Sequence, residues 1–179
     1  MFSRIKEDGD FELSSGVRSS YRYEYERLSD AISEAYCTQL KAKLDAWQKQ
    51  HGNFNAIIGC ETEGIRIGYQ LSCLMDLPFH IMPKKRIDFD QILMPGYPDD
   101  THWLVVDDIV TTGSTFIKAV DYLDIEEKPE SITFTCMIKR NPANLDYSAV
   151  TGDSQKEQFH VRGERFDFID KRLVALFSE

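Results

Sequence analysis

The chain has 179 residues, of which 42% are hydrophobic and 28% are charged, and its formal net charge is −9. This length favours one α/β domain with at most a small added subdomain, and the apolar content is sufficient for a sizeable core. The net charge argues against nucleic-acid binding by the whole surface, and no apolar run approaches the ~20 residues that a membrane-spanning helix needs. The first residues, MFSRIKEDGDFELSSG, are polar and lack the apolar core of a signal peptide, so we expect a cytoplasmic protein.

The apolar pattern predicts helices and strands that alternate along the chain. In order, we expect a helix over 24–50, a strand over 54–59, a helix over 64–77, a strand over 79–82, a polar loop over 83–100, a strand over 102–107, a helix over 114–123 and a strand over 131–138. A loop follows over 141–155, and 168–177 is interpreted as a closing helix. This alternation is typical of a central parallel sheet flanked by helices, in which ligands bind at the carboxyl ends of the strands.

Two further patterns concern the core. Six apolar residues recur at helical spacing in the first helix: Leu28, Ile32, Tyr36, Leu40, Leu44 and Trp47. The cysteines Cys37, Cys60, Cys73 and Cys136 form no C-x-x-C pair and have no histidine at zinc-finger spacing. We interpret them as reduced thiols of the core.

The segment LVVDDIVTTGSTF carries the strongest functional pattern. An apolar strand delivers Asp107 and Asp108, and the hydroxyl-rich stretch 111–115 follows and opens a helix. A helix start presents unpaired N–H groups, and Gly113 lets the backbone come close, which suits a phosphate. The carboxylates would repel a phosphate but suit sugar hydroxyls or Mg²⁺. A ribose with a 5′-phosphate satisfies both demands, whereas Asp108 as a turn cap and Ser114 as a helix N-cap are the simpler alternatives for each residue alone.

The segment GCETEG follows the preceding strand and opens the next helix. Gly59 and Gly64 have the spacing of a Walker A loop, but Ile65 and Arg66 stand where its Lys-Ser/Thr should follow, so the sequence excludes a P-loop NTPase. A short turn bounded by glycines is still able to bind a pyrophosphate through backbone N–H groups.

Three stretches together resemble one family. VVDDIVTTGST is similar to the phosphoribosyl-pyrophosphate (PRPP) signature of type I phosphoribosyltransferases. FELSSGVRSSYRYEYERL, over 11–28, resembles the amino-terminal segment of orotate phosphoribosyltransferases, and IIGCETEGIRIG, over 57–68, resembles their pyrophosphate loop and helix. The resemblance implies the type I phosphoribosyltransferase fold, a central parallel sheet flanked by helices with a small hood from the N-terminal segment. It further implies a single domain over 1–179, with the hood in 1–28 and the PRPP-binding core in 54–140.

The resemblance also implies roles for individual residues. PRPP would contact the pyrophosphate loop, one lysine of a mobile loop and the block after the strand: Thr62, Glu63, Gly64, Lys84, Asp107, Asp108, Ile109, Val110, Thr111, Thr112, Gly113, Ser114 and Thr115. The base would contact Arg22, Tyr23, Thr111 and Arg140. In the family an arginine at the position of Arg140 pairs with the orotate carboxylate, and a guanidinium suits such a pair. A solvated charge at the end of a strand is the alternative for Arg140.

The mobile loop departs from the family pattern. In MPKKRIDFDQILMPG, Lys84 matches one of two expected lysines, whereas Ile87 replaces the other and Phe89-Asp90 replaces a His-Gly pair. Lys85 and Arg86 keep positive charge nearby, so Lys84, Lys85 and Arg86 are the candidate catalytic cations beside Asp107 and Asp108. Glu63 adds negative charge where many relatives have a lysine or a small residue.

The resemblance implies an enzyme that transfers the 5-phosphoribosyl group of PRPP to a pyrimidine base, orotate to orotidine 5′-phosphate, with release of pyrophosphate. It implies Mg²⁺ bound mainly through PRPP, with no direct metal ligand, and a homodimer. Two alternatives stay open: a regulator that binds PRPP or a nucleotide with little catalysis, and a phosphoribosyltransferase for another base. Tyr21, Tyr23 and Tyr25 would lie at a dimer interface or pack under the first helix.

Overall fold

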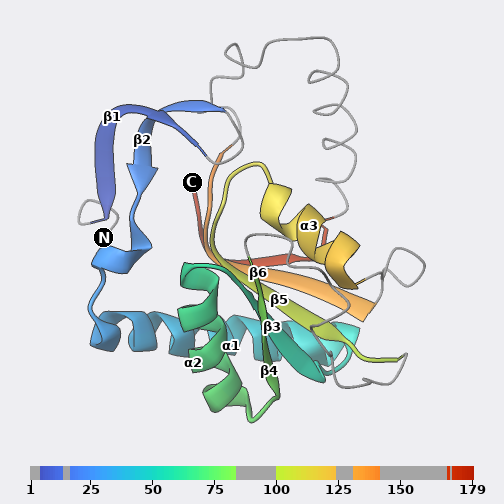
Figure 1. The fold of residues 1–179 in the computed structure, drawn as a ribbon. Coiled ribbons are helices and arrows are strands. Elements are labelled where there is room, and N and C mark those ends of the chain that lie inside the picture. The colour runs from blue at the N-terminus through green and yellow to red at the C-terminus, as the bar shows by residue number, and fades with distance from the viewer. Residues whose placement is uncertain (1–4, 14–16, 84–99, 124–130, 142–168, 170) are drawn as a thin grey trace.

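The computed structural model describes residues 5–13, 17–83, 100–123, 131–141, 169 and 171–179 (Figure 1). The elements in chain order are β1 (Lys6–Glu12), β2 (Arg18–Tyr23), a 3-10 turn (Tyr25–Arg27), α1 (Asp30–His51), β3 (Ala56–Cys60), α2 (Glu63–Met75), β4 (Phe79–Met82), β5 (Trp103–Val110), α3 (Ser114–Leu123), β6 (Ile132–Lys139) and β7 (Leu173–Ser178). The described helices are all too short or too polar to cross a membrane.

Five strands form one sheet in the order β4-β3-β5-β6-β7, and every neighbouring pair is parallel. The predicted central parallel sheet is therefore confirmed. The chain runs from β3 outward to β4 and then returns to pair β5 on the other side of β3. The direction of winding thus reverses between β3 and β5, and parallel α/β sheets bind ligands in the crevice outside the carboxyl ends at such a point.

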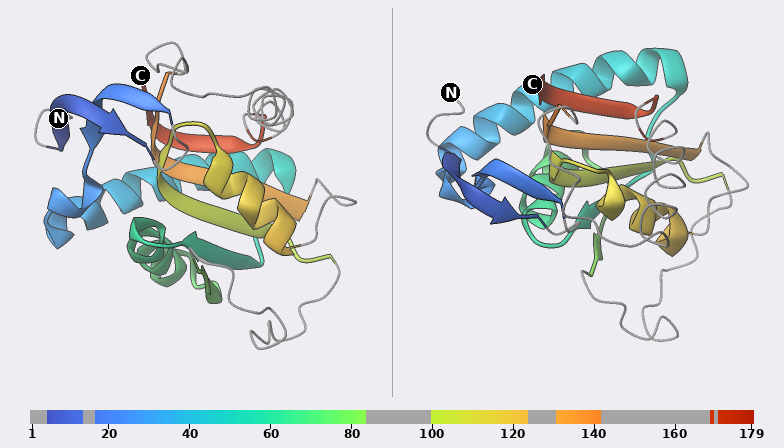
Figure 2. Two further views of the ribbon diagram at one scale, coloured as in Figure 1. Left: turned by 45° about the horizontal axis from the view of Figure 1, so that its top comes forward. Right: turned by 90° about the horizontal axis from the view of Figure 1, so that it is seen from above.

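Helices cover both faces of this sheet, with α1 and α2 on one face and α3 on the other (Figure 2). The alternation of side chains along β3 shows the two layers. Ile57 packs into the cluster that contains Leu40 of α1 and Ile67 of α2, whereas Ile58 packs into the cluster that contains Phe116 of α3. Burying each such side chain contributes about 1.5–3 kcal/mol, so the two cores hold the carboxyl edge of the sheet in place.

The N-terminal segment forms a separate antiparallel hairpin beside the carboxyl ends of the sheet strands (Figure 1). Lys6 of β1 lies opposite Tyr23 of β2, and Glu12 lies opposite Arg18. This hairpin is the hood that the resemblance implies. The proposed boundaries, with the hood in 1–28 and the PRPP-binding core in 54–140 of a single domain over 1–179, stay predictions.

The first helix begins six residues later than predicted. Leu28 and Ser29 have extended backbone angles, and Ser29 occupies the N-cap position, so α1 starts at Asp30. Leu28 shares the helical spacing of the apolar face but is buried from the linker before the helix. Leu40 and Leu44 are buried as predicted, and the remaining apolar residues of the face pack against the same core.

The predicted closing helix over 168–177 is wrong, because Leu173–Ser178 is strand β7. It pairs in parallel with β6, with Phe134 opposite Leu173 and Lys139 opposite Ser178. A short apolar run does not distinguish a buried strand from a buried helix by its spacing. Pairing with a strand far away in the sequence decides its conformation. The loop predicted over 141–155 lies outside the described residues from 142 on.

All four cysteines are free thiols, as predicted, but they are not all in the core. Cys37, Cys60 and Cys136 are buried, whereas Cys73 is exposed on α2. The core prediction for Cys73 is therefore wrong, because the helix turns that residue away from the sheet.

Candidate active site

Two carboxylates lie side by side near the carboxyl end of β5. The strand extends three residues beyond its predicted end, to Val110, so Asp107 and Asp108 are held within the sheet rather than on a loop. Asp107 is buried, and its Oδ1 accepts a hydrogen bond of 2.9 Å from the backbone N–H of Asp108. Burial raises the pKa of Asp107, and the charge of Asp108 raises it further. Burial also raises the pKa of Asp108. Hydrogen-bond donors such as sugar hydroxyls would stabilise both charged forms.

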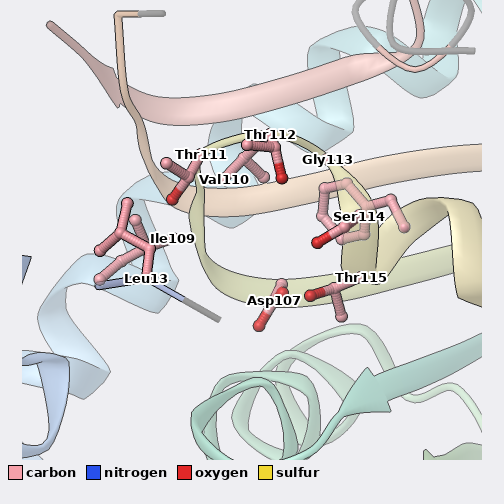
Figure 3. Close-up of a pocket in the computed structure, with 10 residues that line it drawn as sticks. Leu13, Asp107, Ile109, Val110, Thr111, Thr112, Gly113, Ser114 and Thr115 are labelled. Carbon is pink, nitrogen blue, oxygen red and sulfur yellow. The ribbon is translucent and has the colours of Figure 1, made fainter. Parts of the chain in front are cut away.

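A turn rich in hydroxyl groups follows the strand and leads into α3, which begins at Ser114. Gly113 has a φ of 73°, a conformation that glycine adopts without strain, and its carbonyl accepts the N–H of Ile117 at 3.0 Å. A small pocket lies inside this turn, lined by the acid Asp107, the stretch from Ile109 to Phe116 and Leu13 of the hood (Figure 3). Helix N–H groups, hydroxyl donors and a close backbone make this pocket suited to a phosphoryl group.

A larger cleft of about 520 Å³ opens beside this pocket. It is lined by both loops at the switch point and by the start of α3: Glu26, Glu61, Thr62, Glu63, Met82, Pro83, Asp107, Asp108, Ile109, Ser114, Thr115 and Lys118. Its volume falls within the range of small-molecule sites. Because Asp107 and Ser114 line both spaces, one ligand is able to fill the pocket and extend into the cleft.

The cleft is acidic. Burial raises the pKa of Glu63, and the charges of Asp108 and Glu26 raise it further, against the opposite effect of Arg66. Lys118 is the cation among the described residues that line it. No group of three or more potential metal ligands is assembled among the described residues. Carboxylates near phosphate oxygens still fit Mg²⁺, which takes one or two carboxylates together with the phosphates of its substrate.

Gly64 brings the two loops into contact. A Cβ atom at this position would lie 2.5 Å from the carbonyl oxygen of Val106 and 3.1 Å from Cα of Asp107. Since both neighbours are backbone atoms, only a glycine allows the first turn of α2 to approach β5 this closely. Gly59 is equally restricted, because its Cβ would lie 2.6 Å from the carbonyl oxygen of Gly64.

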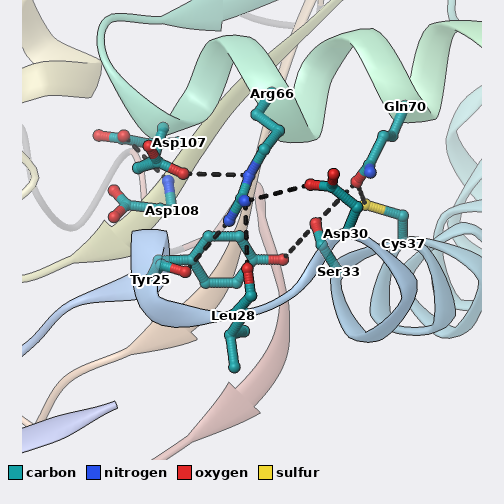
Figure 4. Close-up of polar contacts among 10 residues, drawn as sticks. Tyr25, Leu28, Asp30, Ser33, Cys37, Arg66, Gln70, Asp107 and Asp108 are labelled. Carbon is teal, nitrogen blue, oxygen red and sulfur yellow. Dashed lines mark hydrogen bonds and ion pairs between the residues drawn. The ribbon is translucent and has the colours of Figure 1, made fainter.

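Arg66 connects α2 to residues 25–28, the end of the hood after the β1–β2 hairpin (Figure 4). Its guanidinium donates to the carbonyls of Leu28 at 3.3 Å and Tyr25 at 3.1 Å, and lies 5.1 Å from the centre of the Tyr25 ring. Its Nε lies 3.1 Å from Oε2 of Glu63, although among the described residues neither atom has a partner with hydrogen-bond geometry. Arg66 therefore serves as a structural link between the hood and the cleft.

Arg140 is a buried cation at the carboxyl end of β6, not a solvated one, with 2% of its surface exposed. Its backbone N–H donates to the carbonyl of Val110 at 2.9 Å, which places it beside the hydroxyl turn. Its guanidinium lies 4.2 Å from the ring centre of Tyr21 and 5.8 Å from that of Tyr23, and Nη2 donates to Oγ of Ser19 at 2.8 Å. Nε has no hydrogen-bond acceptor among the described residues.

The alternation along β2 separates the predicted base-binding residues. Tyr23 faces Arg140, whereas Arg22 points to the other side of the strand, where it forms ion pairs with Glu7 at 2.9 Å and with Glu24. Base binding by Arg22 stays a prediction, and this geometry does not favour it. Tyr25 packs under the first helix, with its hydroxyl 3.1 Å from Oγ of Ser33.

The structure brings most of the predicted site residues together and adds several that the sequence analysis missed. Thr62, Glu63, Asp107, Asp108, Ile109, Ser114 and Thr115 line the cleft, and Val110, Thr111, Thr112 and Gly113 line the adjoining pocket. Lys84, Lys85 and Arg86 lie outside the described residues. The additional residues include Leu13 in the pocket, Glu26, Glu61 and Lys118 in the cleft, and Tyr21 and Glu179 beside Arg140. Lys118 stands one helical turn after Ser114, and Leu13 and Tyr21 lie in the stretch 11–28, whereas no pattern in the sequence marked Glu179.

Comparisons with known proteins agree with this geometry. A model of the phosphoribosyl transferase domain matches residues 32–166. An orotate phosphoribosyltransferase of Aeropyrum pernix is 30% identical over 116 residues, 64% of this chain and 62% of that protein. One of Sulfurisphaera tokodaii is 33% identical over 120 residues, 66% of this chain and 60% of that protein. The chain thus spans about three fifths of these relatives. The crystal structure of the Aeropyrum pernix orotate phosphoribosyltransferase superimposes with a TM-score of 0.61 at 23% identity, over 97% of this chain and 88% of that one, which shows a common fold.

Proposed function

Because the chain belongs to the phosphoribosyl transferase domain family, we propose that it transfers the 5-phosphoribosyl group of PRPP to orotate and releases pyrophosphate. The observation that carries the PRPP part is the position of Asp107 and Asp108 near the end of β5, separated by two residues from the hydroxyl turn that begins at Thr111. Carboxylates that accept hydrogen bonds and a turn that donates them lie at one edge of the sheet. A ribose 5-phosphate needs both kinds of group, spaced by the length of the sugar.

The division of the site follows the chemistry of PRPP. The 5′-phosphate fits the pocket formed by Thr111 to Thr115, and the ribose hydroxyls fit the carboxylates of Asp107 and Asp108. The pyrophosphate then extends into the cleft, where Thr62 and the start of α2 lie. Hydrogen bonds from the sugar replace the water that burial removes from the two carboxylates, so binding should restore their charged forms.

The reaction is the attack of a base nitrogen on C1 of the ribose with departure of pyrophosphate. Positive charge develops on the sugar, and the adjacent carboxylates of Asp107 and Asp108 would stabilise it. Negative charge grows on the leaving group, where Lys118 lines the cleft. Lys84, Lys85 and Arg86, which lie outside the described residues, are the further candidate cations that the resemblance implies. Mg²⁺ carried by PRPP would supply further positive charge at the pyrophosphate.

Arg140 supports orotate as the acceptor. Its Nε is a buried donor with no acceptor among the described residues, and leaving such a group unpaired costs about 1–3 kcal/mol. A carboxylate on the base would satisfy it with a charge-assisted hydrogen bond. Val110, which pairs with the backbone of Arg140, lines the phosphate pocket, so base and sugar sites adjoin. The relatives from Aeropyrum pernix and Sulfurisphaera tokodaii are both orotate phosphoribosyltransferases, which also supports orotate as the acceptor.

The acidic cleft favours one alternative, a regulator that binds PRPP or a nucleotide and catalyses little. Glu61 and Glu63 line the part of the cleft where the pyrophosphate would lie. Negative charge there opposes the build-up of negative charge on the leaving group in the transition state. If this repulsion costs as much as the loss of one hydrogen-bond donor to the transition state, turnover falls by roughly 10²–10³-fold. The homodimer, the cytoplasmic location and the base contacts of Tyr23 and Thr111 stay predictions.

One assay separates these functions. The protein is incubated with PRPP, Mg²⁺ and each of orotate, uracil, hypoxanthine and guanine, and pyrophosphate release is followed. We expect release with orotate. If PRPP binds but no base causes release of pyrophosphate, the protein is a regulator. If hypoxanthine or guanine causes the release, the protein is a purine phosphoribosyltransferase.

A charge-matched pair of variants tests the PRPP site itself. Asp107→Asn combined with Asp108→Asn should abolish PRPP binding in calorimetry. Asp8→Asn combined with Asp10→Asn makes the same change in charge on the exposed β1 strand and should leave binding unchanged. Equal affinity in the two double variants would refute the assignment of the site.

A further inference from the structure

A carboxylate of the chain itself already occupies donors beside Arg140. The side chain of Glu179 accepts hydrogen bonds from Oη of Tyr21, at 3.0 Å to Oε1 and 2.9 Å to Oε2, and from Oη of Tyr23, at 2.6 Å to Oε1. The backbone N–H of Asn141 donates to its Oε2 at 3.0 Å. Three donors from two distant parts of the chain thus form an anion site, and Glu179 fills it.

The same two tyrosine rings flank Arg140. The guanidinium lies 4.2 Å from the centre of Tyr21 and 5.8 Å from that of Tyr23, while the hydroxyl ends of these rings hold Glu179. The backbone N–H of Glu179 donates to the carbonyl of Lys139 at 3.1 Å, which aligns it with the residue before Arg140. Partial burial raises the pKa of Glu179, but the hydrogen bonds and the charge of Arg140 outweigh this and lower it below its usual value. Glu179 is therefore ionised at neutral pH.

This arrangement has a consequence for any acceptor that carries a carboxylate. The charges of Glu179 and Arg140 already attract each other, because the tyrosine hydroxyls hold the carboxylate of Glu179 close to the guanidinium. A second carboxylate at Arg140 would either lie beside the negative charge of Glu179 or displace Glu179 from the tyrosine hydroxyls. Repulsion between the two carboxylates or the loss of these hydrogen bonds then weakens the binding of the acceptor. Glu179 is open to displacement, because it is exposed to solvent rather than packed in the core.

We propose that Glu179 determines acceptor preference by competing with the carboxylate of an incoming pyrimidine for the site formed by Arg140, Tyr21 and Tyr23. This proposal rests on the proposed function, since it places the acceptor beside Arg140. Glu179 weakens the binding of bases that carry a carboxylate but not the binding of neutral bases. It therefore lowers the affinity for orotate relative to the affinity for uracil.

The test measures equilibrium binding, so it needs no turnover. Orotate and uracil are each titrated by calorimetry into the wild-type protein, Glu179→Gln and Glu34→Gln, with ribose 5-phosphate present. Glu179→Gln removes the charge but keeps an oxygen that accepts from the tyrosines. Glu34→Gln is the matched control, an exposed glutamate on α1. Glu179→Ala, which removes the acceptor as well, is measured beside them.

We expect Glu179→Gln and Glu179→Ala to bind orotate about tenfold more tightly than the wild type, which corresponds to about 1.4 kcal/mol. Uracil affinity should stay unchanged, and Glu34→Gln should match the wild type for both bases. Orotate affinity that is unchanged or weaker in both Glu179 variants would overturn the proposal. An equal gain for uracil would also overturn it, because a merely structural change affects both bases alike.

A parallel titration with PRPP separates this proposal from the function on which it rests. If PRPP binds and the orotate gain is absent, only the role of Glu179 fails. If PRPP does not bind the wild type, the proposed function fails whatever the bases do. If orotate binds none of the proteins while PRPP binds, both the orotate assignment and the role of Glu179 are wrong.

Discussion

Gly64 at the start of α2 packs directly against the backbone of Asp107 on β5. A Cβ atom on Gly64 would lie 3.1 Å from Cα of Asp107 and 2.5 Å from the carbonyl oxygen of Val106. The loop after β3 and the acid pair on β5 are therefore positioned by one backbone contact across the switch point of the sheet. A substitution on either side of this contact should therefore shift the backbone on the other side.

We expect Gly64→Ala to destabilise the fold by about 1–3 kcal/mol, because a methyl group forced against backbone atoms separates α2 from β5. The same shift moves the acid pair, so PRPP affinity should fall as well. Urea unfolding and calorimetric titration measure the two effects.

Gly52→Ala is the control for this variant. Gly52 ends α1 with a φ of 94°, and a Cβ there would meet no atom within 4 Å. The Gly52→Ala variant should lose about 1–3 kcal/mol through backbone strain and keep its PRPP affinity. If Gly64→Ala also keeps its affinity, the contact does not position the site.

The stability of the ligand-free protein should decrease as the pH rises through the titration range of the acid pair. Burial raises the pKa of Asp107 well above its usual range, and the charge of Asp108 adds to this. The folded state thus binds more protons than the unfolded state between the usual pKa of an aspartate and the raised one. The contribution of Asp107 to the free energy of unfolding is therefore fully present below the usual pKa of an aspartate. This contribution is lost as the pH rises through the raised pKa of the folded state.

Asp107→Asn isolates this effect from other titrating groups. The amide carries no charge, and its oxygen can still accept the N–H of Asp108. We expect the variant to unfold at a higher urea concentration than the wild type at pH 7, and the difference to shrink toward pH 4. Asp8→Asn, on an exposed side chain, should show no such difference. A constant difference across the pH range would mean that Asp107 keeps its usual pKa.

Arg66 should contribute more to stability than an ordinary surface charge. It donates to the carbonyls of Tyr25 and Leu28, and replacing it with methionine removes both donors. We expect Arg66→Met to cost about 1–3 kcal/mol in urea unfolding. Lys41→Met removes a cation that pairs with Asp45 on the surface of α1, which is worth at most about 1 kcal/mol. Equal losses would show that Arg66 is not a structural link.

Thiol labelling should distinguish Cys73 from the other cysteines. Burial raises the pKa of Cys37 to about 12, and it also raises the pKa of Cys60 and Cys136. A buried thiol with a raised pKa reacts slowly, whereas Cys73 is exposed. In the native protein at pH 8, a disulfide reagent should modify Cys73 rapidly and the others only on unfolding. Cys73→Ser should abolish the rapid phase, and its persistence would show that a buried cysteine becomes accessible.

The candidate site was predictable where its residues adjoin in the sequence. Asp107, Asp108 and the hydroxyl turn occur in one stretch after an apolar strand, so their chemistry is local. The alternation of strands and helices likewise follows from periodicity along the chain. Local patterns were less informative at element ends. Leu28 extends the helical spacing before α1 begins, and the apolar run 173–177 lacks any feature that separates a strand from a helix.

The sequence by itself determined the parallel α/β class and the stretch that joins Asp107 and Asp108 to the hydroxyl turn, because side-chain period and neighbouring residues carry that information. Only the tertiary structure decided that Arg140 is buried, that the hydroxyls of Tyr21 and Tyr23 hold Glu179, and that Gly64 touches Asp107. Tyr21 and Glu179 are 158 residues apart. They meet because β7 joins the edge of the sheet while the hairpin lies beside its carboxyl ends, a pairing set by burial of apolar surface across the whole fold.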